Sequence, residues 1–374
     1  MSNLVYITLI DLDDVTSGVA KKITAQCHAL KELNLDVDVI YMSDFGTKIW
    51  NIGSDKRKII GPNKNKGMTF YSSVIKFLKV NAMTYDYAYV RLPYPSLKVF
   101  SFPLIYLFKN KFTKKLFIEI PTYPFFKESK SIKTFCYNTY LILSSLFFNK
   151  KIDIISYMGA DRERIWGVKA VRVFNSVPLK NVPVKKYIAH EGVNFIGVAQ
   201  LAYWHGYDRI IEGIAEYNKR ENPNPVYFHV VGNALSSGND ELKRLEELTT
   251  RLNAEKNVVF HGAMSGKKLD ELFDGMDIAV DSLGRHRSGN EYNCSIKSKE
   301  YCARGIPFIK SHQDDAFLDT DFYYQCSSDE NPVNIAEVIS WLETSNFNSQ
   351  KLREYAEGVF DWRIQLRKIF DQPS

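Results

Sequence analysis

The chain has 374 residues, 45% of them hydrophobic and 25% charged, a composition that excludes disordered and fibrous proteins. Its length favours two domains, each large enough to bury a core of its own. The net charge is +6, but through Lys186 there are 29 basic and 14 acidic residues (+15), whereas the remainder has 20 and 29 (−9). The basic half can bind anionic partners or can simply present a solvated, lysine-rich surface.

The N-terminus, MSNLVYITLIDLDD, turns acidic after a short apolar run and is expected to form a first strand rather than a signal peptide. The longest apolar stretch, around Tyr140 to Phe148, is much shorter than the ~20 residues of a membrane-spanning helix. The five cysteines are scattered without paired spacing, which indicates neither a disulfide framework nor a zinc site. We therefore expect a cytoplasmic protein.

The first half alternates short β-branched runs with longer amphipathic segments, as is typical of a parallel sheet with crossover helices. The expected strands are Leu4–Ile10, Val37–Met42, Tyr87–Arg91, Leu116–Ile120, Ile152–Ser156 and Val171–Phe174. Helical spacing occurs over Gly18–Leu35 and Ser129–Phe148. The stretch Trp50–Pro62, rich in Gly, Asp, Lys and Asn, predicts a hairpin or a surface excursion.

A linker is indicated over Asn175–Glu191, which contains two prolines and no clear periodicity. The alternation restarts after it, with expected strands at Asn194–Ala199, Val226–Val231, Val258–His261, Ile278–Asp281 and Pro307–Lys310. A helix is expected over Asp240–Asn253. The spacing of apolar residues over Gln350–Phe370 predicts one amphipathic terminal helix that packs back across the domain junction.

These elements predict an α/β protein with two Rossmann-like domains that face each other across a cleft. The expected parts are an N-terminal domain at 1–180, a linker at 181–191, a C-terminal domain at 192–349 and a helical segment at 350–374. Ligands of open α/β sheets bind outside the carboxyl ends of the strands, so functional residues are expected there.

The segment Asp281–Lys310 is the most informative part of the chain. Glu300 is expected to begin a helix that ends near Gly305. A carboxylate near a helix start can accept hydrogen bonds from a ribose diol, while free N–H groups of the preceding turn can hold a phosphate. The alternative is a carboxylate that only offsets the helix dipole.

Three motifs follow one another in the second half. They are Trp204-His205-Gly206-Tyr207-Asp208-Arg209, Val231-Gly232 and Lys297-x-x-Glu300-Tyr301-x-Ala303-x-Gly305-x-Pro307. With these motifs the chain resembles family 4 of the retaining glycosyltransferases, which have the GT-B arrangement of two Rossmann-like domains. The resemblance covers the whole chain and is strongest from Asn194 onward. It implies a sugar-nucleotide donor held mainly by the C-terminal domain.

The resemblance also implies roles for single residues. Glu300 matches the glutamate that binds the donor ribose, and Ser295 and Ile296 lie in the loop whose backbone amides meet the diphosphate, with Lys297 beside them. Gly18 matches the glycine-rich loop that lets the donor approach closely. The predicted catalytic residues are Lys297, Glu300 and Arg285. The predicted donor-binding residues are Gly18, Gln200, His205, Arg209, Gly232, Arg287, Ser295, Ile296, Lys297 and Glu300.

Some positions depart from the family pattern. Tyr292 stands where the family has another glutamate, and Gln200 and His205 stand where it has an arginine and a lysine that bind phosphate. The cations expected to replace them beside the leaving diphosphate are Arg209, Arg285, Arg287 and Lys297.

Two of these residues have structural alternatives. His205 can merely cap the helix that starts near Gly206, and Gly18 can serve only close packing of strand and helix. The other unassigned histidines, which have no partner pattern, are expected to be structural or surface residues: His28, His190, His229 and His312.

Acceptor contacts are expected in the first half, from Arg91, Glu119 and Tyr123. Glu119 ends an expected strand just before Pro121-Thr122-Tyr123-Pro124, and a structural turn carboxylate is its alternative role. No Asp-x-Asp motif is placed at a strand end, so we expect no metal and no cofactor beyond the nucleoside-diphosphate sugar.

The sequence thus predicts a retaining glycosyltransferase that moves a sugar from a nucleoside-diphosphate sugar to a hydroxyl of a glycan, lipid-linked or protein acceptor, in surface glycan or glycoconjugate synthesis. The alternatives are a sugar-nucleotide epimerase of the GT-B fold and a non-catalytic module that binds sugar nucleotide or glycan. Nucleic acid is not expected as a partner, because the basic residues are not arranged with an aromatic binding motif.

Two segments of the basic half, Phe100–Lys115 and Tyr137–Lys151, combine apolar bulk with lysines and can lie in a membrane interface. The alternative is that both are crossover helices with their apolar faces buried against the sheet. We predict salt-sensitive, peripheral association with the anionic inner face of the membrane through the N-terminal domain.

Overall fold

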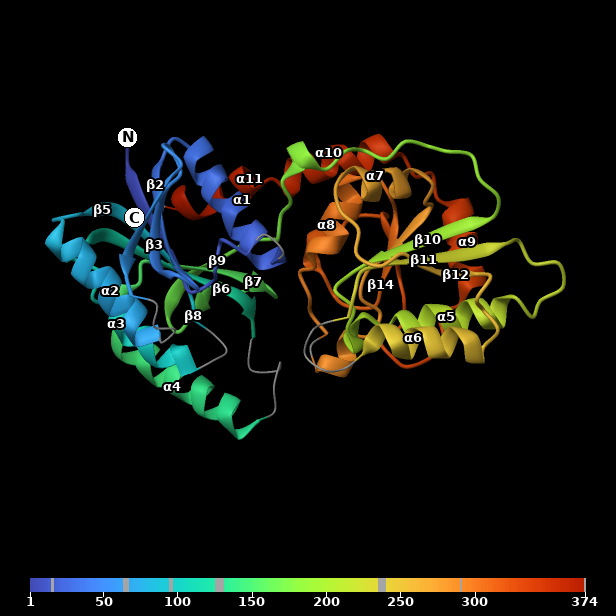
Figure 1. The fold of residues 1–374 in the computed structure, drawn as a ribbon, viewed down its shortest axis with the longest axis horizontal. Coiled ribbons are helices and arrows are strands. Elements are labelled where there is room, and N and C mark those ends of the chain that lie inside the picture. The colour runs from blue at the N-terminus through green and yellow to red at the C-terminus, as the bar shows by residue number, and fades with distance from the viewer. Residues whose placement is uncertain are drawn as a thin grey trace. The chain divides into compact units, whose positions relative to one another are not determined.

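The computed structural model describes residues 1–14, 17–62, 67–93, 97–124, 131–234, 240–289 and 291–372. The chain forms two compact units, each with helices around a sheet (Figure 1). The first unit comprises Met1–Ser176 together with Trp362–Ser374, and the second comprises Val177–Asp361.

The first unit contains a nine-stranded sheet in the described part of the chain, in the order β4-β3-β2-β1-β5-β6-β7-β9-β8. The strands are β1 (Asn3–Thr8), β2 (Asp36–Ser43), β3 (Gly46–Asn51), β4 (Lys56–Gly61), β5 (Tyr85–Arg91), β6 (Thr113–Tyr123), β7 (Ile154–Gly159), β8 (Arg164–Ile165) and β9 (Val168–Arg172). The strands from β2 through β1, β5, β6 and β7 to β9 pair in parallel. Strands β3 and β4 form an antiparallel hairpin, which confirms the prediction for Trp50–Pro62.

Helices cover both faces of this sheet because β1 is apolar on both sides. Val5 and Ile7 belong to one core, whereas Tyr6 points to the other face and donates to Gln26 of the first helix. The helices are α1 (Gly18–Glu32), α2 (Gly67–Val80), α3 (Phe102–Ile105), α4 (Ile132–Phe148) and α11 (Trp362–Phe370), with 3-10 turns η1 (Leu97–Ser101) and η3 (Asn149–Lys151).

The second unit contains a parallel sheet, six-stranded within the described residues, in the order β12-β11-β10-β13-β14-β15. Its strands are β10 (Val193–Val198), β11 (Val226–Val231), β12 (Val258–Phe260), β13 (Ile278–Val280), β14 (Phe308–Lys310) and β15 (Tyr323–Gln325). Its helices are α5 (Tyr207–Tyr217), α6 (Glu241–Arg251), α7 (Lys267–Asp274), α8 (Ile296–Ala303), α9 (Ile335–Thr344) and α10 (Ser349–Val359). Short 3-10 turns complete it: η4 (Leu179–Asn181), η5 (Tyr203–His205), η6 (Arg285–Ser288) and η7 (Asp315–Phe317). Both units are therefore Rossmann-like, as predicted.

The end of the chain differs from the single helix expected over Gln350–Phe370. It forms two helices, α10 and α11, and the break falls where the ring of Phe360 is buried against Phe317, 5.1 Å between centroids. Helix α11 then returns to the first unit, where the side chain of Gln365 accepts a hydrogen bond from the N–H of Phe174 at 2.9 Å. The predicted return of a terminal helix is confirmed, although that helix begins only at Trp362.

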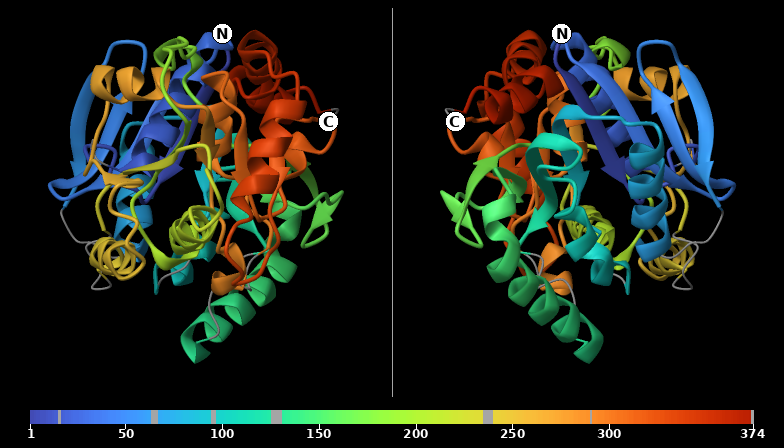
Figure 2. Two further views of the ribbon diagram at one scale, coloured as in Figure 1. Left: turned by 90° about the vertical axis from the view of Figure 1, so that its right-hand side faces the viewer. Right: turned by 90° about the vertical axis from the view of Figure 1, so that its left-hand side faces the viewer.

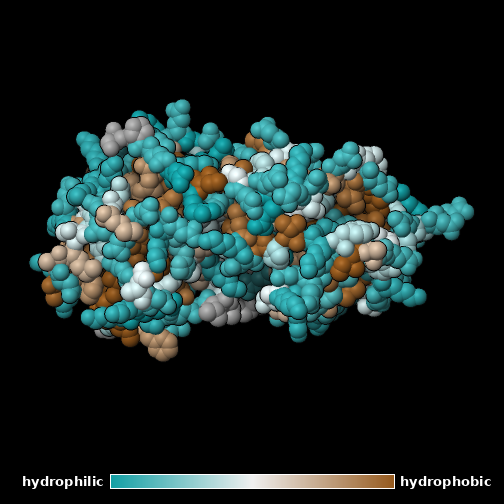
Figure 3. Space-filling view, turned by 90° about the horizontal axis from the view of Figure 1, so that it is seen from above, coloured by the Kyte–Doolittle hydropathy of each residue, from teal (hydrophilic) through white to brown (hydrophobic). Residues whose placement is uncertain are grey.

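Figure 3 shows hydrophilic and hydrophobic side chains on one face of the molecule. Hydrophilic side chains cover most of the face seen in Figure 3, and hydrophobic ones are interspersed among them. Among the helices of the described residues, none has the length and apolar character needed to cross a bilayer.

Candidate functional site

The side chain of Ser295 connects the carboxyl end of β13 to the start of α8. Asp281 follows β13, and its Oδ1 accepts hydrogen bonds from the Ser295 hydroxyl at 2.9 Å and from the N–H of Ser282 at 2.7 Å. Ser295 is also the N-cap of α8, because its Oγ accepts the N–H of Lys297 at 3.2 Å. The strand end and the helix start are thus fixed relative to each other.

The helix starts earlier than the sequence indicated. We expected Glu300 to begin it, but the Ser295 cap places the first helical residue at Ile296, so Glu300 lies in the second turn. The first turn of α8 contains no acidic residue, which leaves the positive end of its dipole free of a negative side chain from this helix.

A buried ion pair lies at this junction. The ammonium of Lys297 is 3.3 Å from Asp281 Oδ1 and donates to the Ser282 hydroxyl at 3.2 Å. Asp281 is fully buried and Lys297 is 20% exposed. Burial alone would raise the pKa of Asp281, but the charge of Lys297 and the hydrogen bonds from Ser295 and Ser282 hold it well below its usual range. Burial lowers the pKa of Lys297, and the Asp281 charge opposes that effect.

His312 lies on the other side of the same carboxylate. Its Nε2 is 3.7 Å from Asp281 Oδ2, and its Nδ1 donates to the Ser282 carbonyl at 3.2 Å. Within the described residues, neither His312 Nε2 nor Asp281 Oδ2 has a hydrogen-bond partner. Burial lowers the pKa of His312 to about 4, so the ring is neutral near pH 7.

His205 offers a hydrogen-bond donor to the same region. Its Nδ1 accepts the N–H of Ala202 at 3.1 Å, so the proton of the neutral ring is on Nε2. Burial and the charge of Lys297 lower the pKa of His205 well below its usual range. The charge of Arg285 also lowers the pKa values of both His205 and Lys297. The N–H of Leu283, two residues after Asp281, donates to the His205 carbonyl at 2.8 Å, so His205 is tied to the loop that follows Asp281.

The first turn of α8 adds backbone donors. The first N–H groups of a helix have no acceptor within the helix, and the Ser295 side chain satisfies that of Lys297. The N–H groups of Ile296 and Ser298 point in the same direction from the helix end. Such an end attracts anions through its N–H groups and its dipole. With the neighbouring cations, this arrangement can bind a phosphate group.

Glu300 lies on α8 beside this helix end, three residues after Lys297. Its Oε1 accepts hydrogen bonds from Arg304 Nε at 3.0 Å and Nη2 at 2.9 Å, and Arg304 also pairs with Asp270 at 2.7 Å. The Glu300 side chain is 31% exposed. The ion pair orients the carboxylate while leaving part of it accessible, so the ribose contact stays a prediction.

Two glycines allow close approach of the loops around the site. Gly232 follows β11 with φ +135, and a Cβ there would lie 1.7 Å from the carbonyl oxygen of Ala199. Gly206 precedes α5 with φ +66, and a Cβ there would lie 2.6 Å from the N–H nitrogen of Gly284. Both positions therefore exclude any side chain.

Arg209 is 1% exposed, and its Nη1 donates to the carbonyl of Leu283, two residues after Asp281, at 2.5 Å. Its Nε donates to the Asn331 carbonyl at 2.7 Å, its Nη1 to the Ser327 carbonyl at 3.0 Å and its Nη2 to Asp329 at 3.0 Å. These bonds connect α5 to the loop after β15. Contact with a donor would require Arg209 to exchange several of them.

Arg287, on η6, is also bound by protein groups. It donates to Asp208 at 3.0 Å, to the Tyr203 carbonyl at 2.8 Å and to Glu330 at 3.0 Å. The contacts with Tyr203 and Asp208 tie η6 to the loop that carries His205. Gln200, by contrast, is exposed directly after β10. The donor contacts of both residues remain predictions.

In the first unit, Glu119 and Arg91 form the centre of a buried polar cluster. Glu119 is fully buried, pairs with Arg91, lies 4.0 Å from Lys22 and accepts from Tyr6 at 3.0 Å and from Gln26 at 3.3 Å. Burial raises its pKa, but the charges of Arg91 and then Lys22 outweigh burial and lower it. Glu119 would have to leave these partners to contact an acceptor.

Tyr123 and Gly18 are more open. Tyr123 ends β6 half-buried, and the guanidinium of Arg162 lies 5.6 Å from its ring centre. Gly18 begins α1, and a Cβ added there would meet nothing within 4 Å. Close strand–helix packing therefore does not explain a glycine at this position.

Neither Asp281 nor His312 was among the functional residues predicted from the sequence. Asp281 ends an expected strand, and a carboxylate at a strand end was the available signal for it. His312 was expected to be structural or at the surface, and it is fully buried. Its approach to Asp281 joins residues 31 positions apart, which no local pattern encodes.

No group of three or more His, Cys, Asp or Glu side chains in the described residues has the geometry to hold a metal ion. The expected independence from metal remains a prediction.

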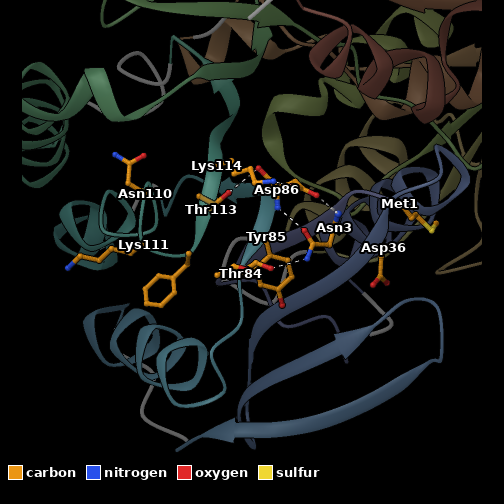
Figure 4. Close-up of a pocket in the computed structure, with 11 residues that line it drawn as sticks. Met1, Asn3, Asp36, Thr84, Tyr85, Asp86, Asn110, Lys111, Thr113 and Lys114 are labelled. Carbon is orange, nitrogen blue, oxygen red and sulfur yellow. Dashed lines mark hydrogen bonds and ion pairs between the residues drawn. The ribbon is translucent and has the colours of Figure 1, made fainter.

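A separate cavity of about 680 Å³ lies at the amino ends of strands in the first sheet. Figure 4 shows Asp86 between Asn3 and Lys114 in its lining, with the Lys114 ammonium 2.7 Å from Asp86. Ligands of open α/β sheets bind at the opposite, carboxyl ends of the strands. Because the Asp86 carboxylate is already paired with Lys114, we assign this cavity no role in the site.

Residues 183–358, which lie within the second unit, match the family model described as glycosyl transferases group 1. No curated protein sequence matches the chain. Sucrose-phosphate synthase from Thermosynechococcus elongatus is 12% identical with a TM-score of 0.70, over 99% of this chain and 98% of that one. A glycosyltransferase from Rickettsia africae is 12% identical with a TM-score of 0.68, over 99% and 97%. HepE from Anabaena, in complex with UDP, is 12% identical with a TM-score of 0.65, over 99% of both chains.

The chain has the GT-B fold. Similarity over almost the whole of both chains confirms the predicted two-domain α/β architecture, and at 12% identity it establishes the fold alone. The matched region contains β13 and α8, so the cluster of Asp281, Lys297, His205 and Arg285 lies in the part of this GT-B protein that matches the glycosyltransferase model. The region similar to group 1 glycosyl transferases thus lies within a chain of GT-B fold.

Proposed function

We propose that this GT-B protein is a retaining glycosyltransferase of family 4. Its second unit would bind a nucleoside-diphosphate sugar and its first unit an acceptor hydroxyl. The observation that carries the proposal is the Lys297 ammonium, which Asp281 and Ser282 hold at the start of α8, with the His205 carbonyl bound to Leu283 two residues after Asp281. Cations and N–H donors fixed beside a leaving diphosphate are the main electrostatic requirement of sugar transfer.

Lys297 is the strongest candidate for stabilising the leaving diphosphate. An ammonium has three N–H donors, and the contacts with Asp281 and Ser282 use two of them. The third N–H, together with the His205 Nε2–H and the Arg285 guanidinium, would bind phosphate oxygens. Because Asp281 holds the ammonium before the donor arrives, little reorganisation is needed as charge develops.

In the proposed reaction, the bond between the anomeric carbon and the diphosphate oxygen breaks, and a bond to the acceptor oxygen forms on the same face of the sugar. The acceptor proton passes to the leaving phosphate oxygen, so no separate base is required. Glu300 would hold the donor ribose. This course retains the anomeric configuration.

The nucleotides bound by structural relatives guide the choice of donor. HepE has been solved with UDP and with UDP-glucose, and starch synthase IV from Arabidopsis thaliana with ADP. A lipopolysaccharide outer core galactosyltransferase, WaaB, has a TM-score of 0.62 to this chain. These relatives support a nucleoside-diphosphate hexose as donor and a surface glycan or glycoconjugate as product.

A two-step experiment tests the proposal. A thermal-shift screen of UDP, GDP, ADP and CMP sugars should find a conjugate that raises the melting temperature, because it binds only the folded state. That conjugate should then release free nucleoside diphosphate and, with an acceptor, give a product of unchanged anomeric configuration by NMR. Conversion of the sugar to its epimer would instead identify an epimerase, and binding without release would identify a binding module. Inversion of configuration would refute the retaining mode.

A further inference from the structure

Helix α4 of the first unit exposes much of its apolar surface. The side chains that it buries are mostly small and polar: Thr134, Asn138, Leu141, Ser144 and Ser145. Six of its large apolar side chains are exposed by between 37% and 84%: Ile132, Phe135, Ile142, Leu143, Leu146 and Phe147. We call these six residues the outer face of α4. Leu141 is buried, and Tyr137, Tyr140 and Phe148 pack against the core. A crossover helix that only covers a sheet turns its large apolar side chains inward.

The inner face of α4 explains how this exposure is tolerated. The hydroxyls of Ser144 and Ser145 donate to helix carbonyls, those of Leu141 at 3.1 Å and Ile142 at 2.7 Å. These two small, hydrogen-bonded side chains let the helix approach the unit closely. The apolar residues of the outer face are thus not required for packing within the unit.

The outer face forms a continuous stripe at the margin of the first unit. Each of its residues has another three, four or seven positions away, spacings that place them on one side of the helix. The 17 residues of α4 extend for about 25 Å. In Figures 1 and 2, α4 runs along the edge of the unit, with one side turned away from its other elements. A contiguous exposed apolar surface of this kind marks an interaction site.

Both ends of the stripe are positively charged. Lys133 lies near its start and Lys150 and Lys151 follow its end, all three exposed. The sequence has no acidic residue from Ile132 to Lys151. An apolar face bordered by lysines fits the boundary between lipid tails and anionic headgroups.

The same charges disfavour a second copy of the chain as the occupant. In a symmetric dimer the two stripes would lie against each other. Because lysines stand at both ends, parallel and antiparallel alignments alike would bring Lys133 close to lysines of the other copy. A membrane surface that carries negative charge along its whole area has no such conflict.

We propose that the outer face of α4 docks the protein on an anionic membrane surface, with Phe135 and Phe147 inserted at the level of the headgroups. This locates the membrane association predicted from sequence on one helix. The first of the two segments predicted to contact lipid behaves differently, because Phe102, Ile105 and Phe108 are fully buried in the core. The inference is independent of the proposed transferase activity.

Co-sedimentation of the full chain with vesicles tests the proposal. Wild-type protein should bind equimolar phosphatidylglycerol and phosphatidylcholine at low salt, and phosphatidylcholine alone much more weakly. The double variant Phe135→Ser/Phe147→Ser should bind the anionic vesicles at least about tenfold more weakly, because two aromatic anchors are lost. Phe45→Ser is the matched control, since Phe45 and Phe135 are both 72% exposed and lie in the same unit.

The charged border has its own test. Lys133→Gln/Lys150→Gln/Lys151→Gln should weaken binding to the anionic vesicles by roughly a hundredfold and leave the weak binding to neutral vesicles unchanged. About 0.5 M salt, which shortens the screening length to roughly 4 Å, should weaken the wild type similarly. The matched control changes the exposed Lys56, Lys58 and Lys79 to glutamine and should bind as the wild type does, within a few-fold.

Three results would overturn the proposal. In the first, the wild-type protein does not bind anionic vesicles at low salt. In the second, the Phe135→Ser/Phe147→Ser variant binds them as well as the wild type does. In the third, sedimentation velocity shows that the wild type is a dimer and that this variant is a monomer. The last result would assign the outer face to a second copy. Circular dichroism should show native folds for all variants, because every changed side chain is exposed. None of these measurements uses a sugar nucleotide, so they are unaffected by the outcome of the transferase assays.

Discussion

The carboxylate of Asp281 and the ammonium of Lys297 lie 3.3 Å apart where β13 ends and α8 begins. The same carboxylate accepts from the Ser295 hydroxyl that caps α8. One buried anion thus holds both the proposed phosphate-binding cation and the helix end beside it. Stability therefore depends on the neutralised charge of the pair, whereas the proposed catalysis depends on the Lys297 ammonium itself. Variants of the two residues can separate these effects.

Lys297→Gln should lower both stability and turnover. Loss of the ammonium leaves the fully buried Asp281 without its cation, at a cost of about 2 kcal/mol, because Ser295 and Ser282 still donate to it. Turnover should fall by a factor on the order of 10² if Lys297 meets charge that develops on the leaving group. Thermal melting and donor-saturated kcat measure the two effects.

The double variant Asp281→Asn/Lys297→Gln is the control. It replaces the ion pair by two neutral amides, so the melting temperature should recover towards that of the wild type while kcat stays low. If kcat recovers together with stability, Lys297 acts on folding rather than on the leaving group. An effect confined to KM would indicate that Lys297 binds the ground state and the transition state equally.

Glu300→Gln should weaken donor binding and leave the fold intact. Glu300 is 31% exposed, and its i,i+4 pair with Arg304 contributes well under about 1 kcal/mol. A carboxylate that accepts from a ribose diol makes stronger bonds than an amide, so the Kd of the sugar nucleotide should rise by roughly tenfold. Calorimetric titration gives this Kd. An unchanged Kd with intact folding would remove Glu300 from the donor site.

The sequence predicted the elements of both units well because strands there are short, apolar and separated by amphipathic helices. The ranges Val226–Val231 and Val37–Met42 fall on β11 and β2. The helix boundaries near caps and breaks were less accurate. The Ser295 cap moves the start of α8, and the buried ring of Phe360 divides the terminal helix.

The candidate site was only partly predictable, for a physical reason. Lys297 and Glu300 share a helix, so a motif could locate them. The partner that holds Lys297 comes from elsewhere, since Asp281 is 16 residues before it. His205, whose pKa the Lys297 charge lowers, belongs to η5. Arg209 shows the opposite case, in which a residue of a matching motif is fully bound within the protein. The tertiary fold, rather than local spacing, decides which cations remain accessible.

Replacement by alanine should change stability differently at Gly232 and Gly18, two glycines predicted from the sequence to bind the donor. Gly232→Ala should destabilise by at least about 2 kcal/mol, because φ is +135 and the new Cβ would lie 1.7 Å from the Ala199 oxygen. Gly18→Ala should be neutral or stabilising by up to about 1 kcal/mol, because it begins a helix in open space. Thermal melting compares the two variants. If Gly18→Ala instead loses donor turnover at unchanged stability, the predicted donor contact of Gly18 is supported.

His312 should make the protein sensitive to mild acid. Its buried ring has a pKa of about 4, against 6.5 for an exposed histidine. Between these pH values the unfolded chain binds a proton at this position and the folded chain does not, so lowering the pH favours unfolding. Relative to pH 7, this one group should remove roughly 2 kcal/mol of stability at pH 5.

The charged groups around His312 do not reverse this sign. Asp281 and Asp314 raise its pKa and Lys310 lowers it, but burial is the largest effect. His312→Asn should therefore be less stable than the wild type at pH 7, because the Asp281 pocket is underfilled, yet its stability should change less between pH 7 and pH 5. The half-buried His229, whose pKa burial also lowers to about 4, is present in both proteins and cancels in the comparison. Denaturant unfolding at the two pH values gives the difference. Parallel pH profiles for wild type and variant would show that His312 titrates normally, which its complete burial against the Asp281 carboxylate argues against.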